Sequence, residues 1–174
     1  MVLVQGEALG TTWVVKSVEE VTPTAEQDVR TIVEEALAEV DVQMSTYRPD
    51  SELMKLNRVQ STEGIAVGSE LQTVIGESLE IGKASAGAFD VTVGPLVEAW
   101  GFGPDNRRTP PEDGVVESLL PSLGQDKIRL EGGRLWKSHE SVDIDLSAIA
   151  KGYAVDLVVD RLLETGRTDL MAEV

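Results

Sequence analysis

The sequence predicts an α+β fold in which a mixed sheet packs against three long helices, and three observations support this class. Apolar residues recur at helical spacing in segments 24–44, 69–85 and 146–164. Several shorter segments are rich in β-branched residues or alternate apolar and polar side chains, as half-buried strands do. With 174 residues, the chain has the length of one average domain and is expected to fold around one core.

The first part of the chain is expected to form a strand and then a long helix. Thr11–Val18 is β-branched and apolar enough for a strand, whereas Gly6 interrupts the apolar pattern before it. Thr24–Gln27 has the pattern of a capping box, which predicts that the first helix begins there and runs to about residue 44. Pro49 should end this helical region, and Ser51 can begin a short second helix.

A second long helix is expected from Ser69 to about residue 85. Ser69–Gln72 is another capping box, and Gly87 is placed to end the helix. Gly76 and Gly82 interrupt it at a cost of about 1 kcal/mol each relative to alanine. Two explanations are open, which are close packing against a neighbour and simple tolerance.

The last part of the chain alternates strands with the third long helix. Segment 101–111 contains too many glycines and prolines for a regular element and is predicted to be a long loop. Segment 127–138 has two glycines at its centre and predicts a tight hairpin. Val142–Asp145 alternates like a strand, Leu146–Glu164 should be helical with Asp145 as its cap, and Leu170–Val174 is a final apolar strand. As an unpaired edge, that last strand predicts self-association.

Composition excludes several classes of protein. Asp and Glu number 31 against 15 Lys and Arg, so the net charge of −16 disfavours binding to nucleic acid or to anionic lipid surfaces. The absence of cysteine excludes disulfides, thiolate nucleophiles and thiolate metal sites. The only histidine, His139, lies in a polar stretch and is interpreted as a surface residue. No segment is apolar and long enough to span a bilayer, and Met1–Gln5 lacks the features of a signal peptide.

Four short segments contain side chains suited to chemistry, and each has a structural alternative. Asp90, in the turn Gly87–Asp90, can bind a ligand hydroxyl or simply cap backbone N–H groups. Asp143 and Asp145 can hold a hard cation together, or Asp145 can be a plain helix cap beside a solvated neighbour. Trp100–Gly103 offers aromatic rings for stacking on a flat ligand or for anchoring a loop.

The fourth segment, Ser147–Gly152, consists largely of small residues at the expected start of a helix. Its free N–H groups and the side chain of Lys151 suit an anion such as a phosphate. The alternative is that small residues only allow this helix to pack closely.

Five motifs occur in the order found in one known family. They are Leu9–Thr12, Met44–Leu53 with Asn57, Gly87–Leu96, Trp100–Pro104 and Asp145–Asp156. Together they resemble the FAD:protein FMN transferases, the ApbE-type flavin transferases, over essentially the whole chain. The resemblance implies that residues 1–174 are an ApbE-like flavin transferase domain, with the fold of the N-terminal half of that family.

The resemblance also implies an activity and a set of contacts. Such enzymes split FAD, transfer FMN to a Thr or Ser of an acceptor flavoprotein and release AMP, usually with Mg²⁺. The flavin contacts would fall on Leu9, Tyr47, Ala88, Phe89, Asp90, Asp145 and Lys151. The backbone carbonyl of Ala148 would be a metal ligand. Leu9 stands where the family usually has methionine, and both are flexible apolar residues.

Members of the family are roughly twice as long as this chain. The resemblance therefore implies that the acidic and Thr metal ligands and a catalytic histidine lie in a C-terminal half beyond Val174, so that no catalytic residue is assigned here. A second chain or a homo-oligomer could complete the site. The alternatives are a shortened flavin-binding or partner-binding module without catalysis and a purely structural domain. The family is usually exported or lipid-anchored, but this sequence has no lipobox cysteine, so its location is left open.

Overall fold

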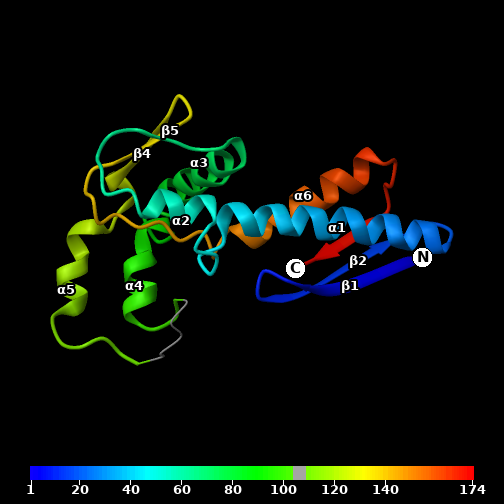
Figure 1. Cartoon of the computed structure of the whole chain (residues 1–174), viewed down its shortest axis with the longest axis horizontal. Coiled ribbons are helices and arrows are strands. Elements are labelled where there is room, and N and C mark those ends of the chain that lie inside the picture. Colours follow the sequence, from blue (N-terminus) through cyan, green and yellow to red (C-terminus); the bar gives the residue numbers. More distant parts are fainter. Residues whose placement is uncertain (104–108) are drawn as a thin grey trace. The chain divides into compact units, whose positions relative to one another are not determined.

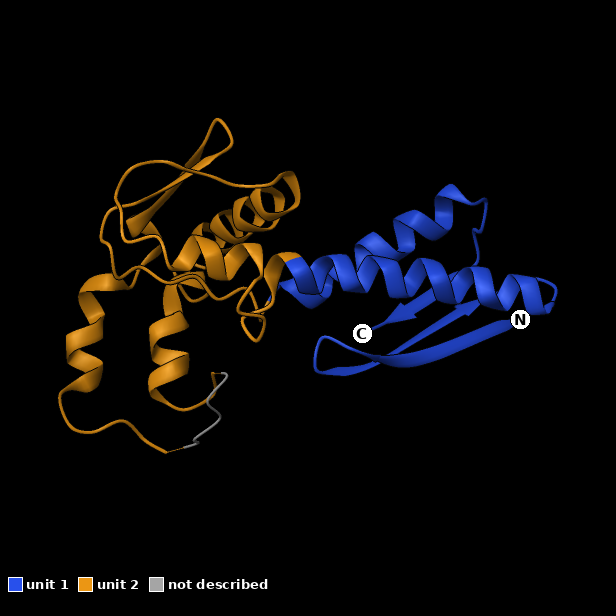
Figure 2. Ribbon diagram, viewed as in Figure 1, with its two compact units in different colours: residues 1–42, 149–174 blue, residues 43–148 orange. Residues whose placement is uncertain are grey.

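The computed structural model describes residues 1–103 and 109–174, which form two compact units (Figures 1 and 2). Unit 1 comprises residues 1–42 and 149–174, and unit 2 comprises residues 43–148. Part of the predicted 101–111 loop, residues 104–108, lies outside the described residues. None of the helices within the described ranges combines the length and the apolar character that crossing a membrane requires.

The α+β class is confirmed, but the expectation of one mixed sheet is wrong. The described strands form two three-stranded sheets, and every pair of neighbouring strands is antiparallel. For two of these pairs the reason lies in the connections. Tight hairpins join β1 (Val2–Ala8) to β2 (Thr11–Ser17) and β4 (Ile128–Glu131) to β5 (Arg134–Lys137), and such short links can only produce antiparallel pairs.

Unit 1 is a sheet with two helices on one face (Figure 2). Its strand order is β1-β2-β6, with β6 at an edge as predicted. Side chains alternate along β1 and β2 between buried and more exposed positions, so that one face of the sheet forms the core. The elements are β1 (Val2–Ala8), β2 (Thr11–Ser17), α1 (Pro23–Met44), α6 (Ala150–Glu164) and β6 (Leu170–Glu173).

Gly6 lies inside β1, although the sequence suggested an interruption there. A Cβ atom at this position would lie 2.7 Å from the ring of Trp13, which is 1% exposed and pairs with Gly6 across the hairpin. The glycine therefore makes room for a buried indole in an otherwise regular strand.

Two predicted helix caps are wrong in detail, although both helices are confirmed. Helix α1 begins at Pro23, and Thr22 takes the capping role predicted for Thr24. The hydroxyl of Thr22 accepts a hydrogen bond from the Ala25 N–H at 3.0 Å. Helix α3 (Ser69–Ala84) has Gly68 as its N-cap, and Gln72 donates its side-chain amide to the carbonyl of Val67 at 2.6 Å. Both caps thus come from residues just before the predicted motifs.

Unit 2 contains the second sheet, in the order β3-β5-β4, and short helices around it (Figure 1). The predicted hairpin is confirmed, with Gly132 and Gly133 at φ 54° and 76° between its strands. The predicted cap of the short second helix is also confirmed, since the Ser51 hydroxyl accepts a hydrogen bond from the Met54 N–H. Besides α3, the elements are α2 (Glu52–Asn57), β3 (Ile65–Ala66), η1 (Val91–Val93), α4 (Gly94–Ala99), α5 (Val115–Leu119), η2 (Leu120–Ser122), η3 (Gln125–Lys127), β4 (Ile128–Glu131) and β5 (Arg134–Lys137).

Segment 142–146 is extended but is not a strand, which corrects the prediction for Val142–Asp145. Its apolar side chains are buried as a strand pattern requires. Its backbone, however, forms no strand ladder, and several of its polar groups pair with side chains. Asn57 donates its amide to the Ile144 carbonyl at 2.9 Å and accepts the Ile144 N–H at 3.0 Å, and Lys137 donates to the Val142 carbonyl at 3.3 Å.

Candidate functional site

The turn after α3 carries three of the predicted flavin contacts. Ala86 and Gly87 both have positive φ, 54° and 83°, and the Gly87 N–H donates to the carbonyl of Gly82 at 2.8 Å. This left-handed ending turns the chain sharply, so that Ala88–Asp90 leaves the helix end as an exposed to half-buried loop.

Asp90 acts as a backbone cap in the structure. Its Oδ1 atom accepts hydrogen bonds from both the N–H and the hydroxyl of Thr92, at 2.8 and 2.7 Å. The capping interpretation of Asp90 is therefore confirmed. Contact with a ligand hydroxyl stays a prediction, and the two roles are compatible because a carboxylate has two oxygens.

Asp145 lies beside this turn. Its backbone N–H donates to the carbonyl of Val91 at 2.8 Å, which joins the segment around Asp145 to the residue that follows Asp90. The two segments also approach closely at Gly94, where an added Cβ would be 3.2 Å from the Asp143 carbonyl oxygen. Two motifs that are separated by more than fifty positions in the sequence thus meet within unit 2.

The third long helix begins at Ala150, not at Leu146 as predicted, so Asp145 is not its cap. The Asp145 carboxylate instead accepts the Ser147 N–H at 2.7 Å, a local side-chain bond that replaces the first helical turn. Ala148, the residue predicted to offer a metal its carbonyl, is exposed in this short non-helical connection.

Two charged side chains near Asp145 are withdrawn from solvent, Asp143 being half-buried and Lys137 buried. Burial, with the negative charges of Glu98 and Asp145, raises the pKa of Asp143 above its ordinary value, and the positive charge of Lys137 opposes this shift. Lys137 is 1% exposed, and its ammonium donates to the carbonyls of Leu56, Asn57 and Val142 at 3.3–3.4 Å. Burial lowers the pKa of Lys137, and the charge of Asp143 raises it.

Three exposed aromatic side chains belong to the same unit. Trp100 and Phe102 are 45% and 62% exposed, so the interpretation that they anchor their loop in the core is wrong. Tyr47 is 65% exposed, and its hydroxyl donates to the Phe102 carbonyl at 3.3 Å. Exposed aromatic rings are suited to stacking on a flat ligand.

The remaining two predicted flavin contacts lie in unit 1. Leu9 and Gly10 form the β1–β2 turn with φ of 53° and 73°, and the positive φ of Leu9 is unfavourable for a leucine. Lys151 is exposed in the first turn of α6, where a cation can meet a ligand anion.

His139 is exposed and accepts the Ser141 N–H at 3.1 Å through Nδ1, in agreement with its interpretation as a surface residue.

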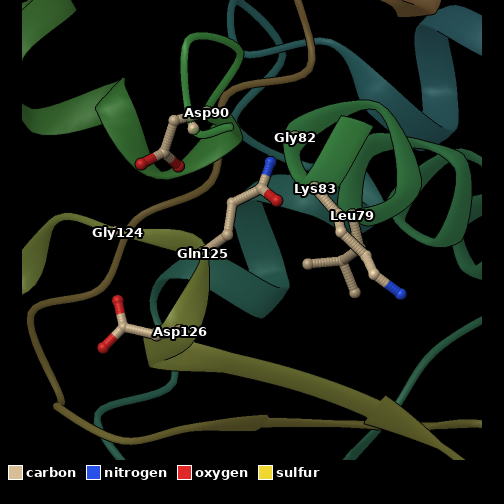
Figure 3. A pocket seen from close by; sticks show the side chains of 8 residues that line it. Leu79, Gly82, Lys83, Asp90, Gly124, Gln125 and Asp126 are labelled. Carbon is tan, nitrogen blue, oxygen red and sulfur yellow. The ribbon is translucent and has the colours of Figure 1, made fainter. Parts of the chain in front are cut away.

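A cavity of about 560 Å³ opens beside the Gly87–Asp90 turn (Figure 3). Asp90 and Gln125 line it from two sides, and Figure 3 shows the Gln125 side chain extending from its loop toward α3. Sequence reasoning did not single out Gln125, since a glutamine in a loop has no distinguishing pattern. The one available indication was the unexplained Gly82 in the middle of a helix.

The donors for a metal ion are incomplete in this part of the chain. Within residues 1–103 and 109–174, no three or more His, Cys, Asp or Glu side chains are arranged to hold a metal ion. The Ala148 carbonyl is a single oxygen donor, and it does not make a Mg²⁺ site without further ligands. These residues therefore do not fit the ion by themselves.

The fold is α+β, with the Gly87–Asp90 turn and the segment around Asp145 joined in one loop cluster, and comparison assigns the family. Residues 9–174 match the ApbE family. The chain belongs to the ApbE family. It is 38% identical over 170 residues to the FAD:protein FMN transferase of Vibrio cholerae serotype O1, covering 97% of this chain and 51% of that protein. The FAD:protein FMN transferase of Haemophilus influenzae is 36% identical over 184 residues, covering 100% and 52%.

Solved structures agree with this assignment. The flavin transferase ApbE from Vibrio cholerae superimposes with a TM-score of 0.94 at 38% identity, over 99% of this chain and 56% of that chain. The apo flavinyl transferase ApbE from Pseudomonas stutzeri gives a TM-score of 0.92 at 32% identity, over 99% and 57%. The chain thus spans about half the length of the relatives that it matches.

Proposed function

We propose that residues 1–174 form the FAD-binding portion of an ApbE-type domain that acts as an FAD:protein FMN transferase. In this reaction a Thr or Ser hydroxyl of an acceptor flavoprotein forms a bond to the phosphorus on the riboflavin side of FAD. The pyrophosphate bond breaks, AMP leaves with the bridging oxygen, and the hydroxyl loses its proton. The flavin contacts are proposed to be Leu9, Tyr47, Ala88, Phe89, Asp90, Asp145 and Lys151.

One observation supports this proposal above the others, which is the 2.8 Å hydrogen bond from Asp145 to the Val91 carbonyl. It brings together the two motifs that carry most of the proposed contacts in unit 2. The exposed ring of Tyr47 suits a flat flavin or adenine, and the exposed ammonium of Lys151 suits a pyrophosphate.

Mg²⁺ is part of this proposal only as an ion that would use the Ala148 carbonyl together with ligands from outside the described residues. When bound, such an ion would neutralise charge on the pyrophosphate. A second copy or another chain could supply the missing ligands, and the acceptor flavoprotein is the second expected partner.

The second function is that of a shortened flavin-binding or partner-binding module. In this alternative the chain binds FAD or a partner protein and does not cleave the pyrophosphate. Binding and turnover distinguish the two functions directly.

The test is titration of the chain with FAD, with and without Mg²⁺, followed by measurement of AMP release in the presence of an acceptor flavoprotein. Binding with AMP release and covalent flavin on the acceptor supports the transferase. Binding without AMP means that the FAD-binding portion is present and the catalytic part is not supplied. No binding of FAD refutes the proposed flavin contacts.

Variants test the proposed contacts. Lys151→Ala and Asp90→Ala should each raise the Kd for FAD about tenfold or more, as expected for loss of a charged hydrogen bond. Asp90→Asn keeps an oxygen for the Thr92 cap and replaces the charged second oxygen with an NH2 group, so it should weaken binding without lowering the melting temperature. Lys55→Ala, at an exposed position of α2, is the matched control. Unchanged affinity in both the Asp90 and Lys151 variants contradicts the assignment.

A further inference from the structure

Gln125 connects three segments of unit 2 through its side-chain amide. It is the first residue of η3, and its Nε2 atom donates to the carbonyls of Ser78 in α3 and of Phe89 in the turn, both at 3.1 Å. A single amide therefore ties the turn that carries the proposed flavin contacts to the middle of a long helix.

Gly82 makes this arrangement possible. Gly82 is buried, and a Cβ atom there would overlap the amide group of Gln125. Gly76, in the same helix, has only Leu130 near an added Cβ, at 3.9 Å. Of the two explanations for these glycines, close packing therefore applies to Gly82 and tolerance to Gly76.

Both backbone polar groups of Phe89 are held by side chains. Its N–H donates to the Ser85 hydroxyl at 3.0 Å, and its carbonyl accepts from Gln125. The neighbouring Gly124 N–H donates to the Thr92 hydroxyl at 2.7 Å, and that hydroxyl donates to Asp90. The loop at 124–125 thus holds the turn at two points, one on each side of Asp90.

We propose that Gln125 is a positioning residue for flavin binding, which fixes the peptide between Phe89 and Asp90 so that Asp90 keeps its orientation toward the ligand. This inference rests on the proposed function, because it assumes that the Ala88–Asp90 turn binds FAD. Gln125 is assigned no contact with the reacting atoms. Its contribution is that the turn does not have to be ordered when the ligand binds.

The primary test replaces Gln125 with leucine, which removes both N–H donors and keeps a side chain of similar size. Gln72→Leu is the matched control, because Gln72 also donates its amide to a backbone carbonyl, that of Val67, but far along α3 from the turn. Titration with FAD should show a Kd at least tenfold higher for Gln125→Leu and within twofold of wild type for Gln72→Leu, with both proteins folded by circular dichroism.

A second pair of variants leaves Gln125 in place. Gly82→Ala should push the amide away from α3 and weaken FAD binding to a similar extent, whereas Gly76→Ala should leave the Kd within twofold. This pair decides the question if Gln125→Leu does not fold, since alanine is a better helix former than glycine and both changes are small.

Amide hydrogen exchange gives a measurement that needs no ligand. In Gln125→Leu, exchange at Phe89 and Thr92 should be at least tenfold faster than in wild type, and in Gln72→Leu it should be unchanged. Wild-type affinity in Gln125→Leu and Gly82→Ala, or equal weakening by the Gln72 control, overturns the inference while leaving the proposed function intact. Failure of the wild-type chain to bind FAD refutes the proposed function, and the exchange rates then still decide whether Gln125 orders the turn.

Discussion

Replacing Asn57 with leucine should destabilise unit 2, because the Asn57 side chain makes the two backbone hydrogen bonds that a neighbouring strand would otherwise make. The Asn57 amide pairs with both backbone groups of Ile144, at 2.9 and 3.0 Å, and Ile144 is 1% exposed. Leucine fills a similar volume but offers neither a donor nor an acceptor. The Ile144 N–H and carbonyl would then be left buried without these partners.

The magnitude follows from those two groups. An unsatisfied buried donor or acceptor costs about 1–3 kcal/mol, so the two together give a loss of about 2–6 kcal/mol in the free energy of unfolding. With a urea dependence of about 2 kcal/mol per molar, the unfolding midpoint should fall by about 1–3 M. Urea titration followed by circular dichroism measures the midpoint, and amide exchange at Ile144 reports the local effect.

Asn57→Asp is the matched variant, because it keeps one oxygen for the Ile144 N–H and replaces the donor with a second oxygen. At neutral pH a carboxylate faces the Ile144 carbonyl, so this variant should be destabilised as well. Protonation restores an O–H donor, so part of the lost stability should return on acidification. A loss below about 0.5 kcal/mol in Asn57→Leu, with Ile144 still protected from exchange, would refute the reasoning.

Two further predictions concern buried groups. Because the folded-state pKa of Asp143 is raised, the folded protein binds the proton more tightly than the unfolded chain, and this group costs stability as pH rises through its folded pKa. Asp143→Asn should therefore raise the urea midpoint at neutral pH, and the advantage should shrink at mildly acidic pH; a lower midpoint that does not change with pH contradicts this. Gly6→Ala should cost about 1–3 kcal/mol, since its Cβ would lie 2.7 Å from the buried Trp13 ring. In thermal melts, Gly152→Ala in the same unit, with nothing within 4 Å of its added Cβ, should be neutral or stabilising, and equal melting temperatures for the two variants would argue against the steric cause.

Local patterns predicted the elements that depend on local interactions. Helix α1 spans Pro23–Met44 and α3 spans Ser69–Ala84, within a few residues of prediction, because apolar spacing reflects which face is buried. The hairpin around Gly132 and Gly133 was equally predictable, since two consecutive left-handed residues leave few alternatives to glycine.

Errors occurred where side chains compete with backbone partners. The third helix starts four residues late because Asp145 bonds to the Ser147 N–H, and an aspartate before an apolar run is equally typical of a helix cap. Segment 142–146 has the alternation of a strand, yet its partner is the amide of Asn57, 87 positions away from Ile144. The alternation of apolar and polar residues indicates which side chains are buried. It does not identify the hydrogen-bond partners of the backbone N–H and C=O groups.

For the candidate site, the order of the motifs in the sequence was enough to indicate the family and the residues to consider. Only the tertiary structure brought Asp145 against Val91 and revealed Gln125 beneath the turn, 36 positions from Phe89. The physical reason is that periodicity and capping depend on neighbours along the chain. Which side chain reaches a distant carbonyl depends on how the elements pack, and a single glutamine or glycine carries no pattern that records it.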